Sequence, residues 1–86
     1  MKGDYRLLID ADVLDLISGL KRADQKRLFG RMREIQAFPS NYCDYEERDS
    51  VGTRVQVNVH AGFAIAYWED FADRHVKVLS VRHVDG

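Results

Sequence analysis

Residues 53–70, TRVQVNVHAGFAIAYWED, constrain the fold of this chain more than any other segment. Valines alternate with polar residues up to position 59, and large and small apolar residues alternate from position 63 to 68. Successive side chains of a strand point to opposite faces, so both runs are typical of half-buried β-strands. Gly62 lies in the short segment between them and favours a turn. The stretch therefore predicts a β-hairpin with one face in the hydrophobic core.

Two registers of this hairpin are compatible with the alternation. A three-residue loop, HAG at 60–62, places the valines on the same face as the large residues Phe63, Ile65 and Tyr67. A two-residue loop instead places Gln56 and Asn58 among those large apolar groups. Burying two unpaired amides would cost about 1–3 kcal/mol each. We therefore expect the three-residue loop, because a buried face specifies its register strongly.

The segments before the hairpin predict one strand and two helices. Residues 5–10 form a β-prone run, and residues 10–20 repeat apolar side chains at helical spacing. A second helical pattern at 21–39 carries one apolar stripe surrounded by basic residues, and Pro39 ends it. Because the two helices are consecutive, we expect an antiparallel helical hairpin.

Two further strands are expected around the central hairpin, at 45–49 and 74–84. Sequential strands joined by short loops pair antiparallel. The sequence therefore predicts an α+β fold with two layers in the order βααβββ(β). In this fold the helical hairpin packs on one face of a small, mostly antiparallel twisted sheet. With 86 residues, the chain is expected to form a single domain, 1–86.

Composition limits the classes of function. The formal net charge is −1, so no global positive field attracts nucleic acid, and any such role must depend on a local patch. Apolar runs are far shorter than the roughly 18 residues that span a membrane, and MKGDYRLL has no signal-peptide core. These features predict a cytoplasmic protein with no membrane partner.

Cysteine and histidine usage gives no sign of a cofactor. Cys43 is the one cysteine and has acidic sequence neighbours, which disfavour a reactive thiolate. His60, His75 and His83 fit no tight ligand spacing. No glycine-rich phosphate loop is present. We therefore expect no cofactor and no metal site.

The face of the sheet opposite the helices is the candidate site. In the expected register, Val76 and Val78 join the core, while Leu79 and Val81 lie on the open face. Ala64 and Ala66 form the floor of that open face. Its polar and aromatic groups are Arg54, Gln56, Asn58, Trp68, Lys77 and His83. Such a surface suits a nucleotide segment, and it is equally typical of the solvated side of an antiparallel sheet.

The order of elements and three sequence stretches resemble a known family. AFP ends the second helix, GFAIAYW lies in the central hairpin, and VKVLSVRHV forms the last strand. In this respect the chain resembles the RelE/ParE superfamily of type II toxin–antitoxin toxins. The family pattern GYRxxY reads GFAIAY here, at 62–67. The resemblance extends over nearly the whole chain, and it is one of order and spacing.

The resemblance implies a toxin that is neutralised by a cognate antitoxin protein. RelE-like members are ribosome-dependent mRNA endonucleases that inhibit translation without a metal. ParE-like members keep the fold, act on DNA gyrase and lack the nuclease residues. Two hypotheses follow: a metal-independent endoribonuclease, and a non-catalytic binding module that inhibits a protein target or only binds its antitoxin. Whether the chain forms a homodimer or a hetero-oligomer with the antitoxin stays open.

Few positions of this sequence match the catalytic residues of the family. The arginine of GYR falls on Ala64, so it is absent. The resemblance then implies Arg54, Arg82 and His83 as catalytic residues, with the histidine as acid or base and the arginines as cations for the transition state. The substrate-binding candidates are Gln56, Asn58, Trp68 and Lys77. The missing arginine, the end of the chain at Gly86 and the near-neutral charge favour the binding module.

Overall fold

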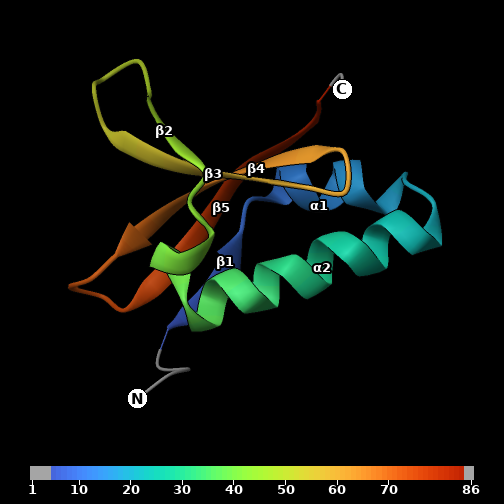
Figure 1. The fold of residues 1–86 in the computed structure, drawn as a ribbon, viewed down its shortest axis with the longest axis horizontal. Helices are drawn as coiled ribbons and strands as arrows, with labels where there is room; N and C mark the ends of the chain where they lie inside the picture. Colours follow the sequence, from blue (N-terminus) through green and yellow to red (C-terminus); the bar gives the residue numbers. More distant parts are fainter. Residues whose placement is uncertain (1–4, 85–86) are drawn as a thin grey trace.

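Two helices cover one face of a five-stranded sheet in the computed structural model, which describes residues 5–84 (Figure 1). The ends of the predicted domain, residues 1–4 and 85–86, lie outside the described residues. The elements in chain order are β1 (Arg6–Ile9), α1 (Ala11–Ser18), α2 (Arg22–Ala37), the 3₁₀ helix η1 (Pro39–Tyr42), β2 (Tyr45–Arg48), β3 (Arg54–His60), β4 (Phe63–Asp70) and β5 (His75–His83).

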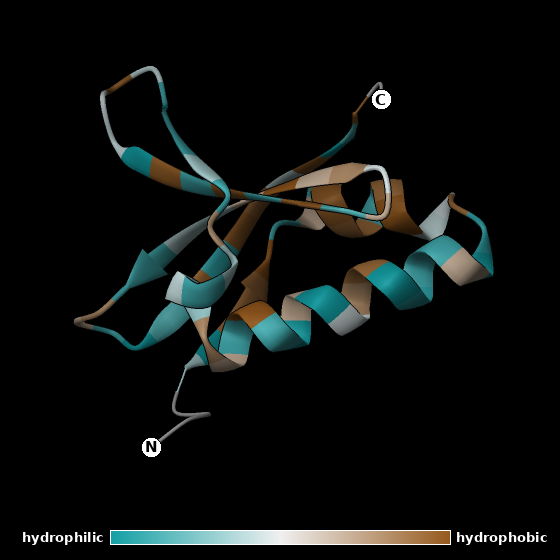
Figure 2. Cartoon of the chain, in the orientation of Figure 1, coloured by the Kyte–Doolittle hydropathy of each residue, from teal (hydrophilic) through white to brown (hydrophobic). Residues whose placement is uncertain are grey.

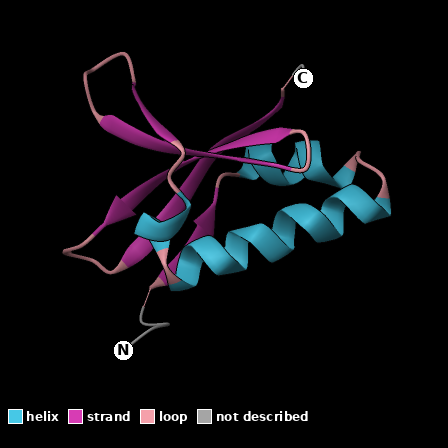
Figure 3. Cartoon of the chain, viewed as in Figure 1, coloured by secondary structure: helices cyan, strands magenta, loops and turns pink. Residues whose placement is uncertain are grey.

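The sheet has the strand order β1-β5-β4-β3-β2. Strand β1 pairs parallel to β5, and the strands from β2 to β5 form an antiparallel meander. The predicted α+β architecture, with a helical hairpin on a mostly antiparallel sheet, is confirmed. The β2–β3 and β4–β5 loops extend from the end of the molecule opposite α1 (Figure 3). Within the described residues, no helix combines the length and the apolar character needed to cross a membrane.

The helices form where the sequence repeats apolar residues at helical spacing. In α1, Val13 and Ile17 are buried, and in α2 the fully buried residues are Leu28, Met32 and Ile35. Most of α1 is hydrophobic, whereas hydrophobic and hydrophilic segments alternate along α2 (Figure 2). The amphipathic pattern thus fixes which side of each helix packs on the sheet.

The main core lies between the helices and the sheet. The sheet contributes Phe63, Ile65, Tyr67, Val76, Val78 and Val81 to it. Tyr67 is fully buried, and its hydroxyl donates a hydrogen bond of 2.8 Å to the Pro39 carbonyl oxygen. Burial also raises the pKa of Tyr67 well above its ordinary value. This hydrogen bond ties the start of η1 to the centre of the sheet.

The expected register of the central hairpin is wrong. The loop contains two residues, Ala61 and Gly62, whose φ values of 55° and 86° lie in the left-handed region. This is the backbone that two-residue β-hairpin turns prefer. As a result Asn58 pairs with Ile65, and Gln56 pairs with Tyr67, on the face that the helices cover. The two amides therefore do not belong to the open face.

Hydrogen bonding explains why burial of Asn58 is tolerated. Its side-chain oxygen accepts a bond of 3.3 Å from Arg31, and its amide nitrogen donates to Asp44 at 3.1 Å. The cost expected from burying an amide applies to unpaired groups, and Asn58 is paired on both sides.

The last strand also departs from expectation, because a β-bulge shifts its register between Ala66 and Tyr67. Val78 pairs with Tyr67, but Ser80 pairs with Ala66, so Leu79 is the extra residue. Beyond the bulge the alternation is inverted. Val81 therefore lies in the main core, where we had expected it on the open face.

The open face has its own apolar cluster. Its buried members are Val55, Val57, Ala64 and Ala66, with Leu79 packed against them. We call this set the open-face cluster. Val55 and Val57, which were expected under the helices, thus pack with the small residues of β4, and the sheet is apolar on both faces. Val59, expected beside them, is exposed.

Candidate functional site on the open face of the sheet

The structure divides the predicted catalytic residues between the two faces. By register, Arg54 lies on the helix side of β3, and His83 lies on the helix side of β5, where its ring packs 4.5 Å from that of Phe63. Arg82 lies on the open face. The expectation that Arg54 and His83 belong to the open face is therefore wrong. The two-residue loop sets the register of β3, and the bulge inverts the end of β5. The sheet itself separates Arg82 from the other two residues.

The three residues are also separated along the strands. His83 pairs with Phe63 at the start of β4, whereas Gln56, two residues after Arg54, pairs with Tyr67. Arg54 is thus level with the far end of β4, about 20 Å from His83 at roughly 3.4 Å per residue. The structure does not bring the three side chains to one point, and their catalytic roles stay predictions.

On the open face, Arg82 forms an ion pair of 3.1 Å with Glu47 of β2. Strands β4 and β3 lie between β5 and β2, so the two side chains can meet only because the sheet curls toward its open face. This curl encloses the open-face cluster. Both side chains are close to half exposed, and exposed ion pairs contribute at most about 1 kcal/mol.

Ala64, which takes the place of the family arginine, is fully buried in the open-face cluster. It pairs with Arg82 on β5 and with Val59 on β3. The position at which a RelE-like nuclease is expected to present a cation therefore forms part of an apolar floor.

Two of the predicted substrate-binding residues do lie together. Trp68 and Lys77 face each other on β4 and β5, and both line a hollow of about 260 Å³ beside Leu79. Lys77 forms no ion pair with any residue between 5 and 84. An unpaired ammonium group beside an aromatic ring suits a phosphate and a base, or an acidic and apolar peptide segment.

A second hollow of about 290 Å³ is lined by Arg54, Gln56 and Trp68, together with Glu46 and Phe71. Arg54 forms an ion pair of 3.3 Å with Glu46 at this site. The side-chain oxygen of Gln56 is buried and has no hydrogen-bond partner among the described residues. Both arginines predicted to act on a phosphate are therefore paired with glutamates.

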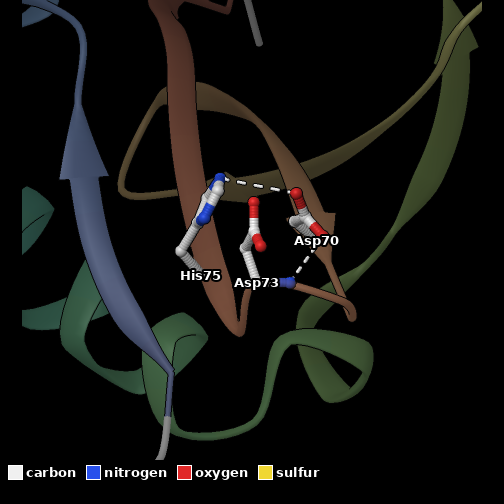
Figure 4. A group of neighbouring side chains, drawn as sticks. All are labelled: Asp70, Asp73 and His75. Carbon is white, nitrogen blue, oxygen red and sulfur yellow. Dashed lines mark hydrogen bonds and ion pairs between the residues drawn. The ribbon is translucent and has the colours of Figure 1, made fainter.

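One group of chemically interesting side chains was missed at the level of sequence. Asp70, Asp73 and His75 gather at the β4–β5 turn, with ligand atoms within 4.8 Å of one another (Figure 4). The signal in the sequence was the spacing D-x-x-D-x-H across a hairpin turn. The spacing of the three histidines could not reveal it, because two of its three members are aspartates.

No protein-family model matches the sequence, and no curated protein matches it. Among solved structures, a chain in the crystal structure of the archaeal RelE–RelB complex from Pyrococcus horikoshii OT3 superposes with a TM-score of 0.77. The alignment covers 94% of this chain and 96% of that chain, at 15% sequence identity. The chain has the RelE fold. At 15% identity this likeness shows the fold of the RelE-like chain and says nothing about its functional residues.

Proposed function

We propose that this RelE-like chain is the toxin component of a type II toxin–antitoxin pair and acts in the cytoplasm. The observation that carries the proposal is the match to a RelE–RelB complex over 94% of the chain. That structure is a complex between a RelE and a RelB protein. By analogy we propose a cognate antitoxin as the partner of this chain.

Such a toxin could stop growth in two ways. The first is metal-independent cleavage of mRNA at the ribosome, with inhibition of translation. In that case Arg82 would be the cation on the open face, and Lys77 and Trp68 would bind the nucleotide. The second is inhibition by binding alone.

The geometry of the arginines favours binding alone. Cleavage of a phosphodiester requires acid–base and cationic groups within about 3 Å of the same reacting atoms. Arg54 and Arg82 lie on opposite faces of the sheet, and each is paired with a glutamate. Ala64 contributes only to the apolar floor. These observations support a toxin whose open face binds a target and does not cut it.

Induced expression of the chain, with and without a partner encoded beside its gene, tests the proposal. We expect growth arrest without the partner, relief of arrest with it, and a stable complex of the two proteins. If growth continues normally and no neighbouring gene product binds the chain, the toxin proposal is wrong.

The same expression experiment distinguishes mRNA cleavage from inhibition by binding alone. Mapping of mRNA 5′ ends should show intact messages if the toxin only binds its target. Cleavage at the ribosome that disappears with Arg82→Ala would instead support the nuclease. Arg33→Ala is the matched control, because Arg33 is exposed on α2 and lies away from the open face.

A further inference from the structure

The turn between β4 and β5 gathers three potential metal ligands from a short segment. Asp70 is the last residue of β4, Asp73 lies in the turn, and His75 begins β5. In Figure 4 the Asp73 carboxylate lies between the His75 ring and the Asp70 carboxylate. One ligand atom from each residue lies within 4.8 Å of the other two. The donor set is two carboxylate oxygens and one imidazole nitrogen.

Two of the three ligands are held in place by the fold. Asp70 and His75 are paired residues of the antiparallel β4–β5 ladder. One Asp70 oxygen, Oδ1, accepts a hydrogen bond of 3.0 Å from the Asp73 backbone N–H, which leaves Oδ2 to face His75. The ring of Trp68 packs edge-on against the imidazole, with the two ring centroids 5.9 Å apart. Little rearrangement is therefore needed at these two positions.

His75 is largely buried but has no hydrogen-bond partner among the described residues. Its side chain is 13% exposed, and Oδ2 of Asp70 lies 3.9 Å from its Nε2. This distance is too long for a hydrogen bond. Ligand atoms about 2.0–2.2 Å from a tetrahedral ion lie roughly 3.3–3.6 Å apart, so an ion between the two atoms requires closure by only a few tenths of an ångström.

We propose that Asp70, Asp73 and His75 bind a divalent transition-metal ion of the Zn²⁺ class, with water completing its coordination. The imidazole nitrogen disfavours Ca²⁺ and Mg²⁺, which select oxygen ligands, and suits zinc, cobalt or nickel. Asp73 is exposed and leaves the site open to solvent. This proposal replaces the sequence-based expectation that the chain has no metal site.

The ion would fasten the end of β4 to the start of β5 across their turn. Trp68 links this site to the hollow that it lines with Lys77. The proposal does not depend on the toxin function, because it concerns residues that take no part in the predicted catalytic set.

Titration of the purified, untagged full-length chain with Co²⁺ provides the direct test. Trp68 is the one tryptophan of the chain and lies beside His75, so its fluorescence should be quenched in a saturable way by one bound Co²⁺. The d–d absorption of the ion should appear in parallel, and Zn²⁺ should displace it. At about a hundredfold excess of Zn²⁺ over its dissociation constant, the melting temperature should rise by roughly 10 °C or more.

Two variants and one control decide whether these residues form the site. Asp73→Asn alters an exposed side chain and should keep the fold, while lowering Co²⁺ affinity at least tenfold. His75→Gln should lower it further. The matched control His60→Gln removes a histidine of β3 outside the turn and should bind Co²⁺ as the unmodified chain does. Absence of saturable binding up to 1 mM Co²⁺, or equal binding by Asp73→Asn and the unmodified chain, would overturn the proposal.

Discussion

Arg31 of α2 and Asn58 of β3 are joined by a hydrogen bond of 3.3 Å across the interface between the helices and the sheet. Asn58 is 3% exposed and also donates to Asp44, whose same oxygen accepts the backbone N–H of Val59 at 2.7 Å. One buried amide thus connects a helix, a strand and the segment before β2. The guanidinium of Arg31 is itself held over the ring of Tyr42, 4.7 Å from its centroid.

We expect Asn58→Leu to destabilise the protein by about 1–3 kcal/mol, even though leucine fills a similar space. The substitution removes one partner from Arg31 and one from Asp44, and polar groups left unpaired in a partly buried site are costly. Urea unfolding measures the effect as a lower midpoint with an unchanged slope. An equally stable Asn58→Leu would mean that the network does not hold the register.

Replacement of Gln56, two residues before Asn58 on the same face, by an apolar residue should have the opposite effect on stability. Its side-chain oxygen is already buried without a partner. Gln56→Met keeps the length of the side chain and removes the unsatisfied group, so we expect it to be neutral or to stabilise the protein by up to about 1 kcal/mol. The same urea experiment tests this, and a loss comparable to that of Asn58→Leu would contradict it.

The contrast between these two residues explains what the sequence could predict. The order of elements, the helical stripes and the location of the hairpin follow from local periodicity, and the structure confirms them. The register depended on whether Asn58 finds partners. Those partners are Arg31 and Asp44, which are distant in sequence and become neighbours only in the folded chain. The desolvation cost of an isolated amide favours the three-residue loop, but Asn58 is paired with both residues and does not incur that cost.

The wrong loop also placed several predicted site residues on the wrong face, because the register decides which face of the sheet each strand residue occupies. A shift by one residue moves each side chain of a strand to the other face. The bulge at Ala66/Tyr67 added a second inversion in β5, which placed His83 on the helix side and its neighbour Arg82 on the open face. Trp68 kept its predicted face because the alternation along β4 is unbroken, and Lys77 kept its face because it precedes the extra residue Leu79 in β5. The alternation of Ala64 and Ala66 with larger residues held the missing signal, since small residues on one face leave room for the valines of β3.

Stability should fall as the pH drops below neutrality, in part through His60. Burial, and next the nearby Arg31 guanidinium, lower the pKa of this imidazole below its ordinary value, while Glu34 opposes and Arg27 adds to the effect. Below about pH 6.5 the unfolded chain therefore binds a proton that the folded chain resists. The contribution is present above that pH and is lost as the pH falls through the folded-state pKa.

An NMR titration of the His60 ring protons measures this pKa directly, and we expect a midpoint below 6.5. In His60→Gln, the unfolding free energy should depend less on pH between about 5 and 7 than in the unmodified chain. A midpoint at or above the ordinary histidine value would contradict the expectation.

The Arg82–Glu47 ion pair offers a test of whether the open face can recruit an anionic target. Glu47→Gln removes the charge that neutralises Arg82 but keeps a side chain of similar size. Because the pair is substantially exposed, the free energy of unfolding should change by less than about 1 kcal/mol. The freed guanidinium should join Lys77 on the same face, so binding of single-stranded RNA should become tighter and more dependent on salt. Fluorescence anisotropy with a labelled oligonucleotide at two salt concentrations measures both effects.

Glu46→Gln is the matched control, since it frees Arg54 on the other side of the sheet. Equal gains in affinity for the two variants would indicate a general effect of net charge, and only a gain confined to Glu47→Gln assigns RNA binding to the open face.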